Sequence, residues 1–210
     1  MNFVVISDTH GKHRRMKLPK GDVLIHAGDV TMDGNDHQTE DFLNWFGKLD
    51  YPHKIFIAGN HDFYFEHQTE KEMAKLVPRG VIYLNDSGIT IEGMRIWGSP
   101  VTPWYFDWAF NCHRGKEIAK HWKLIPQDTD LLITHGPPYG ILDKIGMANH
   151  IGCEELLKKV KVLKPKLHIF GHVHESYGIY KHNGTTFVNA SAVDANYELK
   201  NAALLVEREW

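Results

Sequence analysis

Short apolar segments recur along the chain and predict buried β-strands. Five of them run over four to six apolar, often β-branched residues and stop at glycine or a polar residue. That pattern is typical of strands covered on both faces. They occupy residues 2–7, 22–28, 54–59, 130–134 and 166–171.

Longer stretches carry apolar residues every three or four positions and predict amphipathic helices. We expect these helices at residues 38–49, 69–77, 116–123 and 153–162. The last is closed by Lys164 and Pro165, because proline cannot continue a helix. Helices and strands therefore alternate through most of the chain.

The carboxyl third is richer in strands, which we expect at residues 176–181, 185–189 and 202–206. The sequence His182-Asn183-Gly184 between the first two predicts a β-hairpin. Alternating elements followed by a strand-rich tail indicate an α/β (α+β) fold, in which two sheets pack face to face with helices outside. The chain has 210 residues and contains no repeat or linker, so we expect residues 1–210 to form a single domain.

The composition excludes several classes of function. The 24 basic and 26 acidic residues give a net charge of −2, which provides no basic field for a long nucleic acid. No apolar window is long enough for a membrane span, so no membrane partner is expected. The two cysteines, Cys112 and Cys153, match no zinc spacing and favour a reducing compartment, so we expect a cytoplasmic protein.

Residues with metal-binding side chains follow each of the five buried strands. In chain order they are Asp8, His10, Asp29, Asn60, His135, His172 and His174. Ligands in open α/β folds bind just beyond the carboxyl ends of the strands, so we expect these side chains to meet. Two pairs, Asp8 with His10 and His172 with His174, are spaced to share one face of an extended segment. The glycines before Asp29 and Asn60 are expected to let the chain turn sharply.

The donor set consists of oxygen and imidazole without thiolate. This suits Mn²⁺, Fe, Zn²⁺ or Co²⁺ rather than a sulfur-ligated structural zinc. Seven ligands are too many for one such ion, so we expect two divalent ions that share one carboxylate. Manganese is the first choice, with iron, zinc or cobalt as alternatives.

The ordered motifs D-x-H, G-D, G-N-H-D, H-G and G-H-x-H resemble those of the calcineurin-like metallophosphoesterases. The resemblance spans the chain and is closest to the metallophosphoesterase-domain proteins of animals and their short bacterial relatives. It implies a four-layer αββα sandwich of two mixed β-sheets flanked by helices. It also implies one ion held by Asp8, His10, Asp29 and His174, and a second held by Asp29, Asn60, His135 and His172.

Two such cations about 3.5–4 Å apart would hold a bridging hydroxide that attacks phosphorus. The departing oxygen then needs a proton, and His61, next to Asn60, is the candidate general acid. Asp62 either orients His61 or caps the following turn. Asn60, His61 and Trp104 are expected to touch the substrate. In the aromatic segment 97–108 the alternative to a cleft wall is packing in the core or against another subunit.

The substrate prediction depends on missing arginines. Protein phosphatases of this superfamily carry an arginine just before G-N-H, where this chain has Ala58, and residues 30–36 contain no arginine. A site with few cations favours a singly charged diester. We therefore expect a phosphodiesterase that acts on 2′,3′- or 3′,5′-cyclic nucleotides. The alternatives are a phosphomonoesterase or protein phosphatase, and a nucleotide-binding protein with little turnover; the oligomeric state stays open.

Overall fold

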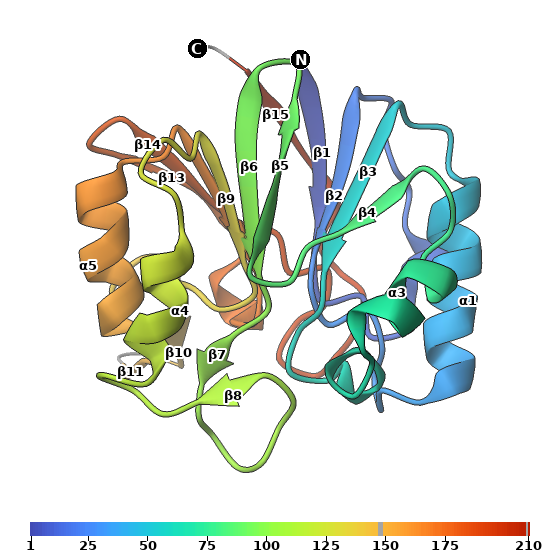
Figure 1. Ribbon diagram of the computed structural model, residues 1–210, viewed down its shortest axis with the longest axis horizontal. Coiled ribbons are helices and arrows are strands. Elements are labelled where there is room, and N and C mark those ends of the chain that lie inside the picture. Colours follow the sequence, from blue (N-terminus) through green and yellow to red (C-terminus); the bar gives the residue numbers. More distant parts are fainter. Residues whose placement is uncertain (147–148, 209) are drawn as a thin grey trace.

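Two β-sheets face each other in the computed structural model, which describes residues 1–146, 149–208 and 210 (Figure 1). The first sheet has the strand order β15-β1-β2-β3-β4, in which β15 is antiparallel to β1 and the other neighbours are parallel. Its strands are β1 (Asn2–Ile6), β2 (Val23–Ala27), β3 (His53–Ile57), β4 (Val81–Tyr83) and β15 (Leu204–Glu207).

The second sheet has the order β13-β14-β12-β9-β6-β5. Its four central strands are parallel, and β13 and β5 are antiparallel edges. Its strands are β5 (Ser87–Ile91), β6 (Met94–Ser99), β9 (Leu131–Thr134), β12 (Leu167–Phe170), β13 (Gly178–His182) and β14 (Thr185–Asn189). Both sheets are therefore mixed.

Helices cover the outer face of each sheet (Figure 1). The first sheet carries α1 (Asp36–Lys48) and α3 (Glu70–Leu76), and the second carries α4 (Ile118–Leu124) and α5 (Glu154–Leu163). This helix–sheet–sheet–helix order confirms the predicted four-layer sandwich. Within the described ranges, no helix combines the length and the apolar character that a membrane crossing requires.

Shorter elements lie in the loops between these layers. They are η1 (His13–Arg15), α2 (Phe63–Glu66), β7 (Thr102–Pro103), β8 (Asn111–Cys112), β10 (Lys144–Ile145), β11 (Asn149–His150) and η2 (His174–Ser176). The paired strands β7 and β8 carry the loop 104–108, in which every residue except Asp107 is aromatic.

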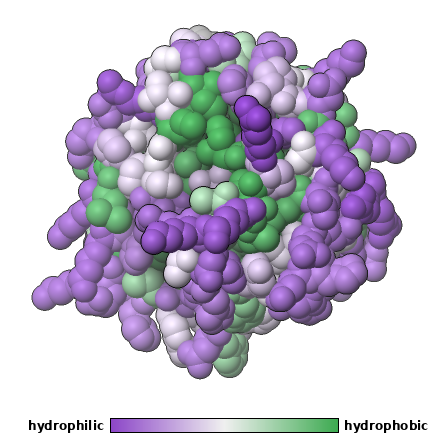
Figure 2. All heavy atoms as spheres, turned by 45° about the vertical axis from the view of Figure 1, so that its right-hand side comes forward, coloured by the Kyte–Doolittle hydropathy of each residue, from purple (hydrophilic) through white to green (hydrophobic). Residues whose placement is uncertain are grey.

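Strand alternation explains why successive positions of β1 from Phe3 to Ile6 are all apolar. On β1, Phe3 and Val5 join the core between the sheets, while Val4 and Ile6 face the helical layer. All four are fully buried, and each contributes about 1.5–3 kcal/mol relative to exposure. Figure 2 shows one face of the outer surface, where hydrophilic side chains surround a smaller hydrophobic area.

The five buried strands and four helices appear within about two residues of their predicted positions. Helix α1 starts at Asp36 because the Asn35 side chain accepts a hydrogen bond from the Gln38 amide. The β5–β6 hairpin was not predicted from the sequence. In the structure its turn contains Glu92 and Gly93, which have positive φ angles of 47° and 77°. The five strands that lead to the candidate ligands divide between the two sheets.

Candidate metal centre

The candidate ligands meet where the carboxyl ends of both sheets approach each other. Strands β1, β2 and β3 of the first sheet lead into the residues up to Asn60, and β9 and β12 of the second lead into the remaining histidines. The structure groups Asp8, His10 and His174, and it groups Asp29, His135 and His172, each set with ligand atoms within 4.8 Å of one another. Both sheets thus contribute to one cluster.

The first group has the geometry of an ion site. His174 Nε2 lies 3.4 Å from Asp8 Oδ1 and 3.4 Å from His10 Nε2. His10 Nε2 is also 3.7 Å from Asp29 Oδ2. Two imidazole nitrogens that face each other beside carboxylates are typical of ligands turned toward a common cation.

The second group contains Asp29, whose Oδ2 also lies near His10 of the first group. His135 Nε2 lies 3.3 Å from Asp29 Oδ2 and 3.0 Å from Asn60 Oδ1. His172 Nδ1 lies 2.7 Å from the same Asn60 oxygen. Ligand atoms about 2.1 Å from an ion are separated by about 3 Å, so the donor set fits two divalent cations with Asp29 between them.

Backbone carbonyl groups orient three of the imidazoles. In each ring Nδ1 faces a carbonyl oxygen, which leaves Nε2 to face the cluster. The pairs are His10 with Thr31 (3.2 Å), His135 with Ala27 (2.9 Å) and His174 with Asp194 (3.2 Å). A hydrogen bond also orients the Asp8 carboxylate, because Ser191 Oγ donates to its Oδ2 at 2.9 Å.

The electrostatics keep most of the ligands in their metal-binding forms. Burial alone would raise the pKa of Asp29, but the charge of His135 holds it well below the usual value. Burial lowers the pKa of His10 and of His172 to about 4, so both rings are neutral at pH 7. His135 differs: burial opposes its charge, yet Asp29 raises its pKa to about 9. A bound divalent cation would displace that proton.

Several ligands occupy strained backbone conformations. The φ angles are 51° for Asp8, 43° for His10, 54° for Asp29 and 68° for His172. Left-handed conformations are uncommon outside glycine and cluster at functional sites. The expectation that each D-x-H or H-x-H pair lies on an extended segment is therefore wrong, because the strands end before these turns begin.

The glycines beside the ligands serve mainly to allow close approach. A Cβ atom on Gly59 would lie 2.3 Å from Asp29 Oδ1, and one on Gly171 would lie 2.0 Å from Asp8 Oδ2. Only Gly28, with a φ angle of 99°, fits the expected sharp turn. Side chains at Gly59 and Gly171 would displace the carboxylates.

His61 lies within the same cluster. Its ligand atom groups with those of His10 and Asp29, and its amide donates to Asp29 Oδ1 at 2.8 Å. Its Nδ1 is 2.7 Å from the carbonyl oxygen of Met32, so Nε2 is free to face the cluster. The geometry suits either a proton donor or an additional ligand.

Asp62 has a different environment from the one expected. Its carboxylate accepts hydrogen bonds from the amides of Val30 (3.1 Å), Thr31 (2.9 Å) and Gly59 (2.8 Å). Its side chain does not cap the following helix α2, and the His61 ring is held by Met32 instead. Asp62 therefore ties the loops after β2 and β3 together. Burial, with the charge of Asp29, raises its pKa to about 6.

A cleft of about 660 Å³ opens onto the cluster. Candidate ligands and His61 form its base, and the aromatic residues that line it are Trp104, Tyr105, Trp108 and Tyr197. Trp108 lies with its ring centroid 4.3 Å from that of His61. Trp104 is 48% exposed at the cleft wall, where the sequence placed it. Tyr197 was missed, because it belongs to no motif and follows the last strand-end ligand by more than twenty residues.

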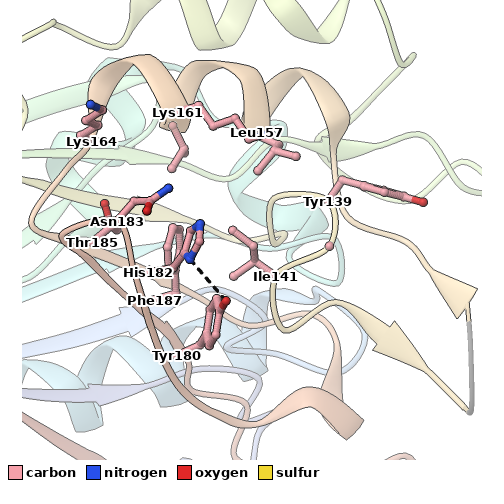
Figure 3. A pocket seen from close by; sticks show the side chains of 12 residues that line it. Tyr139, Ile141, Leu157, Lys161, Lys164, Tyr180, His182, Asn183, Thr185 and Phe187 are labelled. Atoms are coloured by element: carbon pink, nitrogen blue, oxygen red, sulfur yellow. Dashed lines mark hydrogen bonds between the residues drawn. The ribbon is translucent and has the colours of Figure 1, made fainter.

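A second cavity, of about 280 Å³, lies between helix α5 and strands β13 and β14 (Figure 3). Figure 3 shows Lys161 and Leu157 on the helix side and Tyr180 and His182 on the strand side. No candidate ligand lines this cavity in the described part of the chain. It is separate from the metal centre.

Two further histidines contact the residues that immediately precede candidate ligands. His26 Nε2 is 2.9 Å from Thr9 Oγ1, and His168 Nε2 is 2.9 Å from Thr134 Oγ1. Both imidazoles are fully buried, and burial lowers their pKa to about 3. Their threonine partners immediately precede His10 and His135, so these neutral rings brace the ligand-bearing turns. No motif in the sequence distinguished them from the other histidines.

The two ligand groups could hold divalent cations between the two sheets. The calcineurin-like phosphoesterase pattern matches residues 1–176, and the chain belongs to that family. It is 41% identical over 228 residues to metallophosphoesterase domain-containing protein 1 of Homo sapiens, covering 98% of this chain and 70% of the relative. It is 36% identical over 217 residues to UPF0046 protein K07C11.7 of Caenorhabditis elegans, covering 98% and 74%.

Solved structures support the fold. The crystal structure of TT1561 of Thermus thermophilus superimposes with a TM-score of 0.60 at 12% identity, over 90% of this chain and 88% of that one. The family uses divalent metal ions, and the two ligand groups described above fit such ions. The protein is a metal-dependent phosphoester hydrolase.

Proposed function

We propose that the protein is a phosphodiesterase with two metal ions that hydrolyses small phosphodiesters, with 2′,3′- or 3′,5′-cyclic nucleotides as its substrates. The observation that carries this proposal is the scarcity of cationic side chains in the cleft. Of the residues that line it in the described part of the chain, Arg114 is the only lysine or arginine.

Arg114 is already occupied by protein groups. Its Nη1 donates to Glu154 Oε2 at 2.5 Å and to the Gly152 carbonyl at 2.8 Å, and its Nη2 donates to the Ile151 carbonyl at 2.7 Å. A phosphomonoester dianion is typically held by free guanidinium groups that bind two oxygens at once. A diester carries a single charge and needs less compensation, so this cleft favours the diester.

The residues of the chain have separable roles in this proposal. The two ligand groups would hold the ions, which supply a nucleophile at neutral pH and neutralise charge on the phosphoryl oxygens. Asn60 and His61 lie at the base of the cleft, where phosphate would bind. His61, with Nδ1 turned to Met32, would deliver a proton from Nε2 to the departing oxygen.

Metal identity and compartment belong to the same proposal. A donor set of imidazole, carboxylate and amide oxygen suits manganese, and iron, zinc or cobalt would fit the same geometry. Cys112 and Cys153 are both free, which supports a reducing, cytoplasmic environment. The proposed partner is a small nucleotide or other phosphodiester, and neither long nucleic acid nor membrane is included.

The test compares a diester and a monoester that release the same nitrophenolate. Protein loaded with Mn²⁺ should hydrolyse bis-p-nitrophenyl phosphate with a kcat/KM about tenfold or more above that for p-nitrophenyl phosphate. The opposite order would identify a phosphomonoesterase. Absence of metal-dependent turnover on either ester, or on the cyclic nucleotides, would favour a nucleotide-binding protein. An Asp29→Asn variant serves as the control for contaminating activity.

A further inference from the structure

Tyr197 is an aromatic residue of the cleft that no motif marks. Its ring centroid lies 4.9 Å from that of His10, 5.1 Å from His174 and 6.1 Å from His61, each at a steep interplanar angle. It therefore touches two candidate ligands of one ion and the candidate general acid at the same time. Its hydroxyl group makes no hydrogen bond with any residue that the structure describes.

The backbone holds Tyr197 in this position against a conformational cost. Its φ angle is 60°, a left-handed value that is rare for a bulky residue. Its amide donates to the carbonyl of Asp194 at 2.8 Å, and the Lys12 side chain donates to the carbonyl of Tyr197. Such strain persists where surrounding contacts enforce it, and it is concentrated at functional sites.

The loop 194–198 that presents Tyr197 is anchored through Asp194. The carboxylate of Asp194 accepts from the amides of Asn196 and Glu198 at 2.9 Å each, and it pairs with Lys200 at 2.5 Å. The carbonyl of the same Asp194 orients His174. Tyr197 is thus fixed relative to the cluster, as a residue that contacts substrate must be.

We propose that Tyr197 contacts the organic ester group of the substrate and holds it beside His61. This inference rests on the proposed function, because it supposes that phosphate binds at the ligand cluster. An ester oxygen within reach of His61 carries its organic group into the space that Tyr197 and Trp108 border, since both rings contact His61. The phenol ring offers an apolar surface, and its hydroxyl offers a free donor to a ribose oxygen.

The experiment separates recognition of the organic group from recognition of phosphate. Calorimetry on the Mn²⁺-loaded chain would measure Kd for inorganic phosphate and for adenosine 3′-monophosphate, a product of the proposed reaction. Tyr197→Asn removes the ring with a residue that tolerates positive φ. It should weaken nucleotide binding about tenfold and leave phosphate binding within about twofold. Tyr197→Phe keeps the ring and should weaken nucleotide binding about threefold.

Tyr180, in the separate cavity of Figure 3, provides the matched control. Tyr180→Asn should change neither Kd. An equal loss of phosphate and nucleotide binding in Tyr197→Asn would overturn the inference and indicate only a support for His174. Unchanged nucleotide binding would overturn it as well. Should Tyr197→Asn fail to fold, Tyr197→Phe decides: an unchanged ratio of the two Kd values contradicts the proposal.

The same preparations keep this inference distinct from the proposed function. Turnover of diesters by the unmutated chain, with an unchanged binding ratio in the Tyr197 variants, would refute the role of Tyr197 alone. A changed binding ratio without turnover of any ester would refute the phosphodiesterase and leave the binding role of Tyr197 intact.

Discussion

Asp29 is the residue on which the two ligand groups depend. Its Oδ2 faces both His10 and His135, while Oδ1 accepts from the amide of His61. One side chain therefore joins both ion positions to the loop of the candidate acid. Because the other members of the two groups are imidazoles, removing its charge leaves Asp8 as the only carboxylate in the two groups.

Asp29→Asn should therefore weaken the binding of both ions. The variant keeps the shape of the side chain but loses the charge, and we expect affinity for each ion to fall by about a hundredfold. Elemental analysis after dialysis against metal-free buffer would measure the loss. Asp33→Asn, in the same loop but exposed, is the control and should retain full metal content. Unchanged metal content in Asp29→Asn would exclude a shared carboxylate.

His61→Ala tests the proton donor. Its ring lies beside the cluster, but all of the proposed ligands remain without it, so metal content should be nearly unchanged. Turnover of a cyclic nucleotide should fall about a hundredfold, because its ribose oxygen is a poor leaving group without a proton. Turnover of bis-p-nitrophenyl phosphate should fall much less, since nitrophenolate leaves as an anion. Equal losses on both substrates, or a loss of metal, would assign His61 to another role.

At the scale of the elements, the sequence predicted most of what positions the site. Buried strands can be recognised in a sequence as short runs that are mostly apolar. The sequence therefore predicted β1, β2, β3, β9 and β12, together with the residues that follow them. The partly exposed β5 was not, because Thr90 and Ser87 interrupt its pattern. Nor could periodicity assign strands to two different sheets, since pairing depends on contacts between distant segments.

The site shows the same division between local and distant information. Ligand types and their order were local features of the sequence. The left-handed turns of Asp8 and His10 were not, because a residue type does not fix a strained φ angle that distant contacts enforce. Tyr197 and the buried histidines His26 and His168 depend wholly on tertiary packing, and only coordinates reveal them.

Strands β2 and β12 each carry one of these buried histidines, which makes stability depend on pH. The pKa of His168 is about 3 in the folded chain against 6.5 in the unfolded one. Between those values the unfolded state binds more protons, so stability is full above pH 6.5 and falls as the pH drops toward 3. At pH 5 this single residue should cost about 2 kcal/mol relative to pH 8.

The measurement is urea unfolding at pH 8 and pH 5. His168→Gln cannot take up the proton, so the loss of stability between the two pH values should shrink by about 2 kcal/mol relative to the unmutated chain. His37→Gln, at an exposed position on α1, should leave that loss unaltered. A His168→Gln variant with the same pH dependence as the unmutated chain would show that the ring is not held neutral.

At the scale of the whole molecule, the candidate ligands come from both sheets, so bound ions would join the two sheets. Asp8, His10, Asp29 and Asn60 belong to loops of the first sheet, and the other three ligands belong to the second. Each ligand group contains residues from both sheets. Bound ions would therefore cross-link the two halves of the sandwich at the edge where several ligands have left-handed φ angles.

Removal of metal should consequently lower the stability of the entire fold. Ions that bind only the folded chain at about a thousand times their Kd add about 4 kcal/mol, and for a chain of this size that corresponds to about 8–16 °C in Tm. Differential scanning calorimetry with and without a chelator would measure the shift. Asp29→Asn should show little response to the chelator, because it has lost the ions already. If the chelator left the Tm of the unmutated chain unchanged, the ions would not bridge the sheets.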